Sequence, residues 1–491
     1  MDEPKTTDLQ PVSEGGAANS HPIDTDKGLR SLLWRARFCF VTFFLTDLLQ
    51  MTMVSQYALY RETNRKSDGF VDSYFNKTLE NFRTACLSKN GSGEGEDDWR
   101  KIERSASAMV TRLNALELLP SVPVVIFLGL WSDVTQRRSL LMWLPCLGNA
   151  TYSLVLYLDY LLNLGNWMLY VGAISNGVTG GAMLFFCGCA SLLAHTATKE
   201  ELTFNVSCLE IAAAISVSIG SISAGYMLTL VGFPAPLIYL LAISFFALFM
   251  NAFLITDLKP PQPLCWKSLR NQASAMFHLC RCGVPWATVT MFYFITFLFY
   301  IFVHTGEERT NVLFLELEPL CFSAELIGWW LFFEGVVETL GTFLAVKFLF
   351  QFVGDAGLTF LGLAFRIAAC ICLAFSTTKF LVFLSVAFMS LQRIPLSTIR
   401  SSLSKITDLD KQGTVFGLLH SGEAIAAFIG PFVFNVIFTA SVAVVPNPAY
   451  TLATVVTVLV ACISCATLYL RRKYKDELVS EYETLKDSHS Q

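Results

Sequence analysis

Between two long apolar stretches the chain reads Gly129-Leu-Trp-Ser-Asp133-Val-Thr-Gln-Arg137-Arg138. A glycine lets two helices approach closely, and an aspartate at a helix end can pair with an arginine. Two adjacent arginines between apolar stretches also indicate a loop on the cytosolic side of a membrane. The segment therefore predicts a latch between helices. The alternative is a positively charged loop in which the aspartate is incidental.

The chain around this segment is too apolar for an ordinary soluble protein. Of its 491 residues 54% are hydrophobic and 15% are charged, whereas soluble proteins carry about 25% charged residues. Apolar runs long enough to cross about 30 Å of hydrocarbon recur along the chain. They lie at 38–60, 107–131, 139–162, 167–194, 204–231, 234–256, 286–305, 325–352, 356–376, 379–399, 414–440 and 449–470. We expect an all-α membrane protein with twelve transmembrane helices.

One long internal polar stretch, Asp257 to Pro285, divides the twelve runs into six and six. The positively charged residues lie mainly in alternate connections, which predicts that both ends of the chain are cytosolic. The expected organisation is a cytosolic tail at 1–36, a six-helix half at 37–256 with an outer loop at about 61–106, a cytosolic linker at 257–285, a second six-helix half at 286–470 and a cytosolic tail at 471–491.

The first outer loop contains two acceptor patterns for N-glycosylation, at Asn76 and Asn90. They support an outside location for this loop, although so short a pattern also arises by chance. The same pattern at Asn149 and Asn205 falls inside predicted spans, where it carries no such meaning.

Composition excludes several classes of function. A net charge of −4 gives no reason to expect a nucleic-acid partner, and the chain has no phosphate-binding loop that would indicate ATP-driven transport. No polar stretch is long enough for a catalytic domain, so we expect neither an enzyme nor a cofactor. His278-Leu-Cys280-Arg-Cys282 lacks a second ligand pair and favours a packed or palmitoylated cluster over a metal site. The oligomeric state is left open.

Ionisable residues inside membrane spans are costly and indicate function by default. Glu210 lies mid-span, far from any flanking charge, and is the candidate for a carboxyl that loads and releases a proton. His304 ends the seventh predicted span, where imidazole suits proton sensing, although a structural histidine is an equal alternative. The others are Asp47, Glu334, Glu338, Arg366, Arg393, Arg400, His420 and Glu423. Arg366 and Arg393 need acidic partners, for which Glu334, Glu338 and Glu423 are the candidates.

The opening segment resembles the G-x-x-x-D-x-x-G-R-R signature of the major facilitator superfamily. This resemblance implies the major facilitator fold, with a cytosolic latch formed by Gly129, Asp133, Arg137 and Arg138. The sequence departs from the signature at two positions. Val134 replaces the usual basic residue and Gln136 replaces a glycine, which puts the geometry of the turn in question.

Three further segments resemble solute carrier family 46, the family of the proton-coupled folate transporter. They are Pro395-Leu-Ser-Thr-Ile-Arg400-Ser-Ser-Leu-Ser-Lys405 with Gln412-Gly413-Thr414, Glu316-Leu-Glu-Pro319-Leu-Cys321 with Ile327-Gly328, and Leu209-Glu210. The resemblance implies a disulfide between Cys86 and Cys321, a proton-linked role for Glu210 and His304, and a substrate- and proton-linked role for Arg400. A membrane-end anchor is the alternative for Arg400. The folate branch has an aspartate before Gly180-Gly181, where this chain has Val178 and Thr179.

The resemblance implies a proton-coupled symporter of a small, folate-like organic anion, driven by a proton gradient across a lipid bilayer. One alternative is a lysosomal or endosomal exporter of other small molecules, such as peptidoglycan fragments. Another is a non-transporting receptor or scaffold. We favour the plasma membrane, although Tyr482-Glu-Thr-Leu485 has the form of an endosomal or lysosomal sorting signal.

Overall fold

The structure, a computed structural model, describes residues 22–66, 94–196, 199–231, 234–257, 260, 262–279, 285–316, 320, 322, 324–407, 411–441 and 447–474. Within them every regular element is helical. The helices are α1 (Pro22–Lys66), α3 (Glu94–Thr135), α4 (Leu140–Leu162), α5 (Asn166–Val178), α6 (Gly181–Thr196), α7 (Lys199–Val231), α8 (Pro234–Leu254), α9 (Trp266–Leu279), α10 (Pro285–Glu316), α11 (Ala324–Leu344), the π-helix η1 (Ala345–Leu349), α12 (Phe350–Ala374), α13 (Lys379–Met389), α14 (Ile394–Ile406), α15 (Gln412–Ser441) and α16 (Pro448–Lys473). Asn76, Asn90, Cys86 and Cys321 lie outside the described residues.

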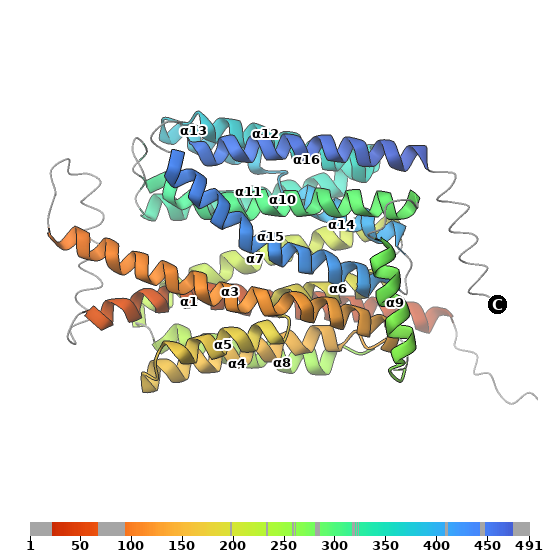
Figure 1. The fold of residues 1–491 in the computed structure, drawn as a ribbon, viewed down its shortest axis with the longest axis horizontal. Helices are drawn as coiled ribbons and strands as arrows, with labels where there is room; N and C mark the ends of the chain where they lie inside the picture. The colour runs from red at the N-terminus through yellow and green to blue at the C-terminus, as the bar shows by residue number, and fades with distance from the viewer. Residues whose placement is uncertain are drawn as a thin grey trace, which may run out of the picture.

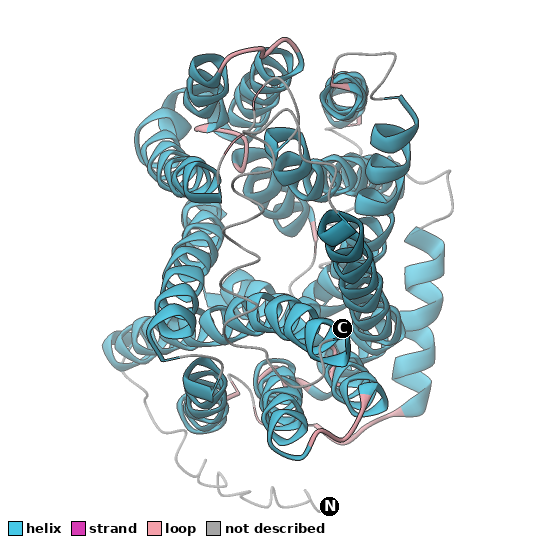
Figure 2. Cartoon of the chain, turned by 90° about the vertical axis from the view of Figure 1, so that its left-hand side faces the viewer, coloured by secondary structure: helices cyan, strands magenta, loops and turns pink. Residues whose placement is uncertain are grey.

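The long helices run side by side along one axis (Figure 1). Helices α4, α5 and α8 of the N-terminal half lie on one side of the bundle, and α12, α13 and α16 of the C-terminal half lie on the other. Between them, α3, α6 and α7 of the first half pack against α15, α14 and α11 of the second. Figure 2 looks along the bundle from one end and shows the helices nearly end-on. The interface between the halves is therefore made by helices that are distant in sequence.

Ten segments of the described residues are long and apolar enough to cross a membrane. One of them, Trp329–Ala374, has 46 residues and would extend about 69 Å as a single helix, twice the thickness of the hydrocarbon layer. Its backbone turns at Gly354, where φ is 63°, so it supplies two of the predicted spans. Helix α7 covers the fifth predicted span. A helix is thus present at each of the twelve predicted spans, and the all-helical membrane fold is confirmed.

The fourth and tenth spans are each broken. The fourth breaks between α5 and α6, where Gly180 and Gly181 have φ values of 88° and 50°. The tenth breaks between α13 and α14, at residues 390–393. Such breaks expose backbone and polar side chains at membrane depth only where protein or water can satisfy them. They occupy corresponding positions in the two halves.

Several helix boundaries differ from the sequence expectation. Helix α3 begins at Glu94 rather than near residue 107, and α10 continues to Glu316 rather than ending near residue 305. Residues beyond the apolar stretch stay helical because Glu, Arg and Ala are good helix formers, whether or not lipid surrounds them. The central linker contains α9, which crosses the end of the bundle at which α16 ends (Figure 1).

Candidate functional site

Asp133 at the end of α3 forms the first contact between the halves. Its carboxylate accepts hydrogen bonds from the backbone N–H of Gly413 at 2.9 Å, from the N–H of Thr414 at 2.6 Å and from the Thr414 hydroxyl at 2.7 Å. Gly413 and Thr414 open α15, where unpaired N–H groups and the helix dipole favour an anion. Arg138 lies 3.7 Å from the same carboxylate. An acid of one half therefore caps a helix of the other.

Gly129 and Gln136 set the geometry of this contact. A Cβ at Gly129 would lie 2.5 Å from the Gly413 carbonyl oxygen, so glycine lets α3 approach α15. Gln136 occupies the position of the signature's glycine and has φ of 59°. Its side-chain amide donates to the Asp133 carbonyl at 2.7 Å, which helps hold this left-handed turn. The structure brings Gly129, Asp133 and Arg138 together, whereas Arg137 is exposed.

The second departure from the signature, Val134, is explained by α9. Val134 and Leu130 form a small buried cluster with Leu269 of that helix. A basic residue at position 134 would have to place its charge under this apolar cover, which is costly. The linker helix and the apolar residue at position 134 therefore belong together.

A second polar contact joins α7 to α12 and α14. Lys405 donates to Asp355 at 2.6 Å and to the Thr203 hydroxyl at 2.7 Å. Thr203 also shares a hydrogen bond of 2.7 Å with Ser401. Sequence reasoning missed Asp355 and Thr203, because each lies one residue before a predicted span. With the Asp133 contact, this group closes the predicted cytosolic ends of the two halves.

Arg400 lies at the centre of the inter-half interface. It is 2% exposed and forms an ion pair with Glu210 of α7. Its Nη2 donates to both carboxylate oxygens of Glu423 on α15, at 2.8 and 2.9 Å. His420 Nδ1 lies 2.6 Å from Glu423. Arg400 is therefore buried between two carboxylates and is not the membrane-end anchor considered as an alternative.

Two aromatic rings enclose the Arg400 guanidinium. Its carbon lies 4.3 Å from the ring centroid of Phe186 and 5.0 Å from that of Phe297. Phe186 belongs to the N-terminal half and Phe297 to the C-terminal half. Cation–π contacts of this kind stabilise a charge that has been removed from water. Residues of both halves therefore hold Arg400 in place.

A separate cluster surrounds Arg366 in the C-terminal half. Arg366 donates to Glu307 at 2.5 Å and lies 3.4 Å from His304 Nδ1. The expectation that Glu334, Glu338 or Glu423 would pair with Arg366 is wrong. Glu307 is the partner because α10 continues past residue 305 and brings this carboxylate inside the bundle. His304 thus lies beside a charge pair.

Arg393 and Glu338 form the third arginine–carboxylate pair. Their atoms are 2.5 Å apart, and the Gln392 amide also donates to Glu338. Glu338 was among the predicted partners of Arg393. Glu334 lies one turn earlier on α11 and is half-buried. The break before α14 places Gln392 and Arg393 where they can reach this carboxylate.

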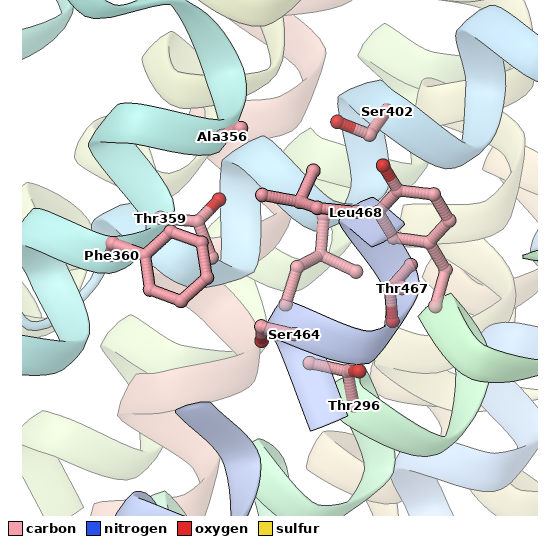
Figure 3. A pocket seen from close by; sticks show the side chains of 10 residues that line it. Thr296, Ala356, Thr359, Phe360, Ser402, Ser464, Thr467 and Leu468 are labelled. Atoms are coloured by element: carbon pink, nitrogen blue, oxygen red, sulfur yellow. The ribbon is translucent and has the colours of Figure 1, made fainter. Parts of the chain in front are cut away.

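A small open crevice lies within the C-terminal half, and none of the ion-paired residues is among its lining residues. Its empty volume is about 320 Å³ and its polar lining consists of hydroxyl groups (Figure 3). The lining residues are Tyr293, Thr296, Ala356, Thr359, Phe360, Ile399, Ser402, Ser464, Thr467 and Leu468. Because no charged group lines it, the crevice does not share the chemistry of the Arg400 cluster.

Comparison with known proteins supports the assignments made from the opening segment. The model of the Major Facilitator Superfamily matches residues 105–309. The lysosomal proton-coupled steroid conjugate and bile acid symporter SLC46A3 of Gallus gallus is 23% identical over 84% of this chain and 89% of its own. The proton-coupled folate transporter of Rattus norvegicus is 22% identical over 72% of this chain and 76% of its own. The resemblance to the superfamily and to solute carrier family 46 is confirmed.

Solved structures show the same fold. The human organic anion transporter MFSD10 has a TM-score of 0.69 at 14% identity, covering 89% of this chain and 99% of its own. The fucose:proton symporter FucP of E. coli has a TM-score of 0.59 at 12% identity, covering 90% of this chain and 99% of its own. These matches concern transporters rather than enzymes, as the sequence led us to expect.

Proposed function

We propose that this chain, a membrane protein of the major facilitator superfamily with relatives in solute carrier family 46, is a proton-coupled symporter of a small organic anion. The observation that carries the proposal is the position of Arg400. It is buried at the inter-half interface and bound by Glu210 from one half and Glu423 from the other. An arginine with a fixed fork of donors suits recognition of a carboxylate or a similar anionic group.

Arg400 and Glu210 provide a direct way to couple proton and substrate. While Glu210 is ionised, its carboxylate occupies donors of Arg400 and links α7 to α14. A proton on Glu210 removes that negative charge and leaves part of the guanidinium for an anion from the substrate. The same proton weakens the link between the halves, which must part for alternating access. Proton and anion therefore bind together, as symport requires.

The names of the relatives narrow the class of substrate. One relative is named for folate and another for steroid conjugates and bile acids. Both groups are organic anions with a large ring system. Phe186 and Phe297 are buried around Arg400 and hold its guanidinium toward the anionic group that the two classes share. We favour a folate-like anion, with a steroid conjugate or bile acid as the second candidate.

The protein is a multi-pass membrane protein, and we propose the plasma membrane as its location. The lysosomal membrane is the alternative, since the relative from Gallus gallus is named as lysosomal. In both cases an acidic outer or luminal compartment would drive protons toward the cytosol past Glu210. Imaging of the tagged chain with surface and lysosomal markers separates the two locations.

Uptake by cells tests the proposal. Cells that express the chain take up labelled folate, or a labelled bile acid, faster at acidic than at neutral external pH. Glu210→Gln removes the acid stimulation, whereas Glu201→Gln, at an exposed site on the same helix, leaves it unchanged. If the chain is lysosomal, the same assay uses isolated lysosomes. Absence of acid-stimulated transport of every anion tested, despite correct localisation, contradicts the proposal and favours a receptor.

A further inference from the structure

Two carboxyl groups inside the N-terminal half have amide partners and no arginine. Asp47 of α1 accepts from Asn149 Nδ2 at 3.3 Å. Glu117 of α3 accepts from Asn176 Nδ2 at 2.9 Å. Neither carboxyl has an ion pair with any side chain that the structure describes, and both are half-buried. Sequence reasoning missed Glu117, although an acid ten residues inside the predicted span 107–131 was a usable signal.

The surroundings of these two groups have an excess of hydrogen-bond acceptors. The amides that bind the two carboxyls lie side by side, since a Cβ on Gly148, the chain neighbour of Asn149, would lie 2.7 Å from Asn176 Oδ1. Asn149 is 1% exposed, and its Oδ1 has no hydrogen-bond partner in the described part of the chain. Asn176 is 0% exposed, and its Oδ1 has no partner in the described part of the chain either. Buried acceptors without donors are costly, so the site calls for a positively charged or hydrogen-donating ligand.

Among the described residues of the surrounding helices, no cation forms an ion pair with Asp47 or Glu117. Glu210 of α7 and Glu423 of α15 are bound to Arg400. Asp159 of α4 is ion-paired with Arg61, which lies near the C-terminal end of α1. Helix α4 also carries the buried Cys146 and Tyr152, and Arg112 of α3 is exposed. His195 ends α6, and the titratable groups of α5 and α8 are Tyr170 and Tyr239.

A proton fits this site better than a metal ion does. Each carboxyl already receives an amide N–H from an asparagine, and a metal ion at the same oxygens would face those positive hydrogens. Hard cations also require about six or more oxygen ligands. A single proton needs only one oxygen, and two neighbouring carboxyls hold one readily because both resist being ionised together. The proton also supplies a donor for a neighbouring acceptor.

We propose that Asp47 and Glu117 form a second proton-binding site, which holds one exchangeable proton within the N-terminal half. It is separate from Glu210, since no described contact joins the two groups. The carrier would then load one proton at the interface between the halves and another inside the first half. The second proton lets the pair remain buried without a counter-ion while the halves move.

Infrared difference spectroscopy of the purified full chain in lipid tests this without a known substrate. Between acidic and neutral pH the wild type shows a carboxyl C=O band that shifts in deuterium oxide. Glu117→Gln and Asp47→Asn, both nearly isosteric, each remove the band of the pair. Asp159→Asn leaves that band in place, because the Asp159 carboxylate is held by Arg61. The pH at which the band of the pair appears is the same in sodium chloride and in choline chloride.

Two results overturn the proposal. The first is that neither Glu117→Gln nor Asp47→Asn removes any carboxyl band that the wild type shows. The other is a band of the pair that sodium removes at constant pH, which would assign the site to a metal cation. Because the band is measured without transport, this test of the Asp47–Glu117 site does not depend on the role proposed for Glu210.

Discussion

Two pairs of acids, one in each half, have different kinds of partner. In the C-terminal half Glu307 and Glu338 are each bound to an arginine, Arg366 and Arg393. In the N-terminal half Asp47 and Glu117 receive only asparagine amides among the described residues. A buried carboxylate that has an arginine to itself is held in its charged form. A carboxylate with amide partners, or one such as Glu210 that shares its arginine with a second acid, can exchange a proton without leaving a cation unpaired. Glu307 and Glu338 are therefore held as fixed charges, whereas Asp47 and Glu117 can change charge.

Arg400 binds an acid of each half. It belongs to the C-terminal half, and it binds one acid of its own half, Glu423, and one of the other, Glu210. Glu210 is thus an acid of the N-terminal half that is bound by an arginine of the other half, whereas Asp159 is bound by Arg61 of its own half. Substitutions that neutralise single acids on each side should therefore have effects of very different size.

The largest effect is expected for Glu307→Gln. It leaves Arg366, which is 1% exposed, as an uncompensated charge in the interior. Breaking a buried pair by removing one partner costs about 3–5 kcal/mol. We expect a loss of this size in the free energy of unfolding, measured by titration of the purified protein with a denaturing detergent.

A charge-free double variant serves as the control for that substitution. Glu307→Leu combined with Arg366→Met removes both charges and retains apolar volume, so it should recover much of the lost stability. If Glu307→Gln unfolds at the same detergent concentration as the wild type, the view of the C-terminal half as a set of fixed charge pairs is wrong.

A smaller effect is expected for Glu338→Gln. Arg393 is 25% exposed, so water can partly solvate the charge that remains. Removing a charged hydrogen-bond partner at such a site costs about 1–3 kcal/mol. The same detergent titration should place this variant between Glu307→Gln and the wild type. An effect as large as that of Glu307→Gln would show that exposure does not set the ranking.

The smallest effect is expected for Asp47→Asn. Asparagine resembles a protonated aspartate and can still accept from Asn149, and no cation loses its partner. The free energy of unfolding should stay within about 0.5 kcal/mol of the wild type. A loss comparable to that of Glu307→Gln would reveal a cation that depends on Asp47, and the contrast between the halves would fail.

Much of the fold was predictable because membrane spans can be recognised in a sequence by their length and apolarity. The twelve runs each correspond to a helix, and Gly129 to Arg138 led to the superfamily. The ends of α3 and α10 were not predictable, because hydropathy marks where lipid ends and not where a helix ends. The Asp133 contact was expected to involve arginine. Its additional partners, the N–H groups of Gly413 and Thr414, carry no side-chain signal in the sequence.

The partners of the buried arginines were harder to predict from the sequence than the helices were. Arg393 and Glu338 were expected as possible partners, because both lay inside predicted spans. Glu307 lies two residues past the predicted span 286–305, within Gly306-Glu307-Glu308-Arg309, and is therefore not among the candidate partners. Pairing depends on which faces of distant helices meet, and a single sequence does not contain that information.

Transport by the purified chain in lipid vesicles tests the central role of Glu210 and Arg400 most directly. The assay compares accumulation of a labelled anion driven by a pH gradient with exchange of labelled for unlabelled anion at equal pH. For Glu210→Gln we predict that exchange persists, because Arg400 is free to bind the anion, and that accumulation is lost, because no proton is released at the link. Accumulation equal to that of the wild type in Glu210→Gln would contradict the account.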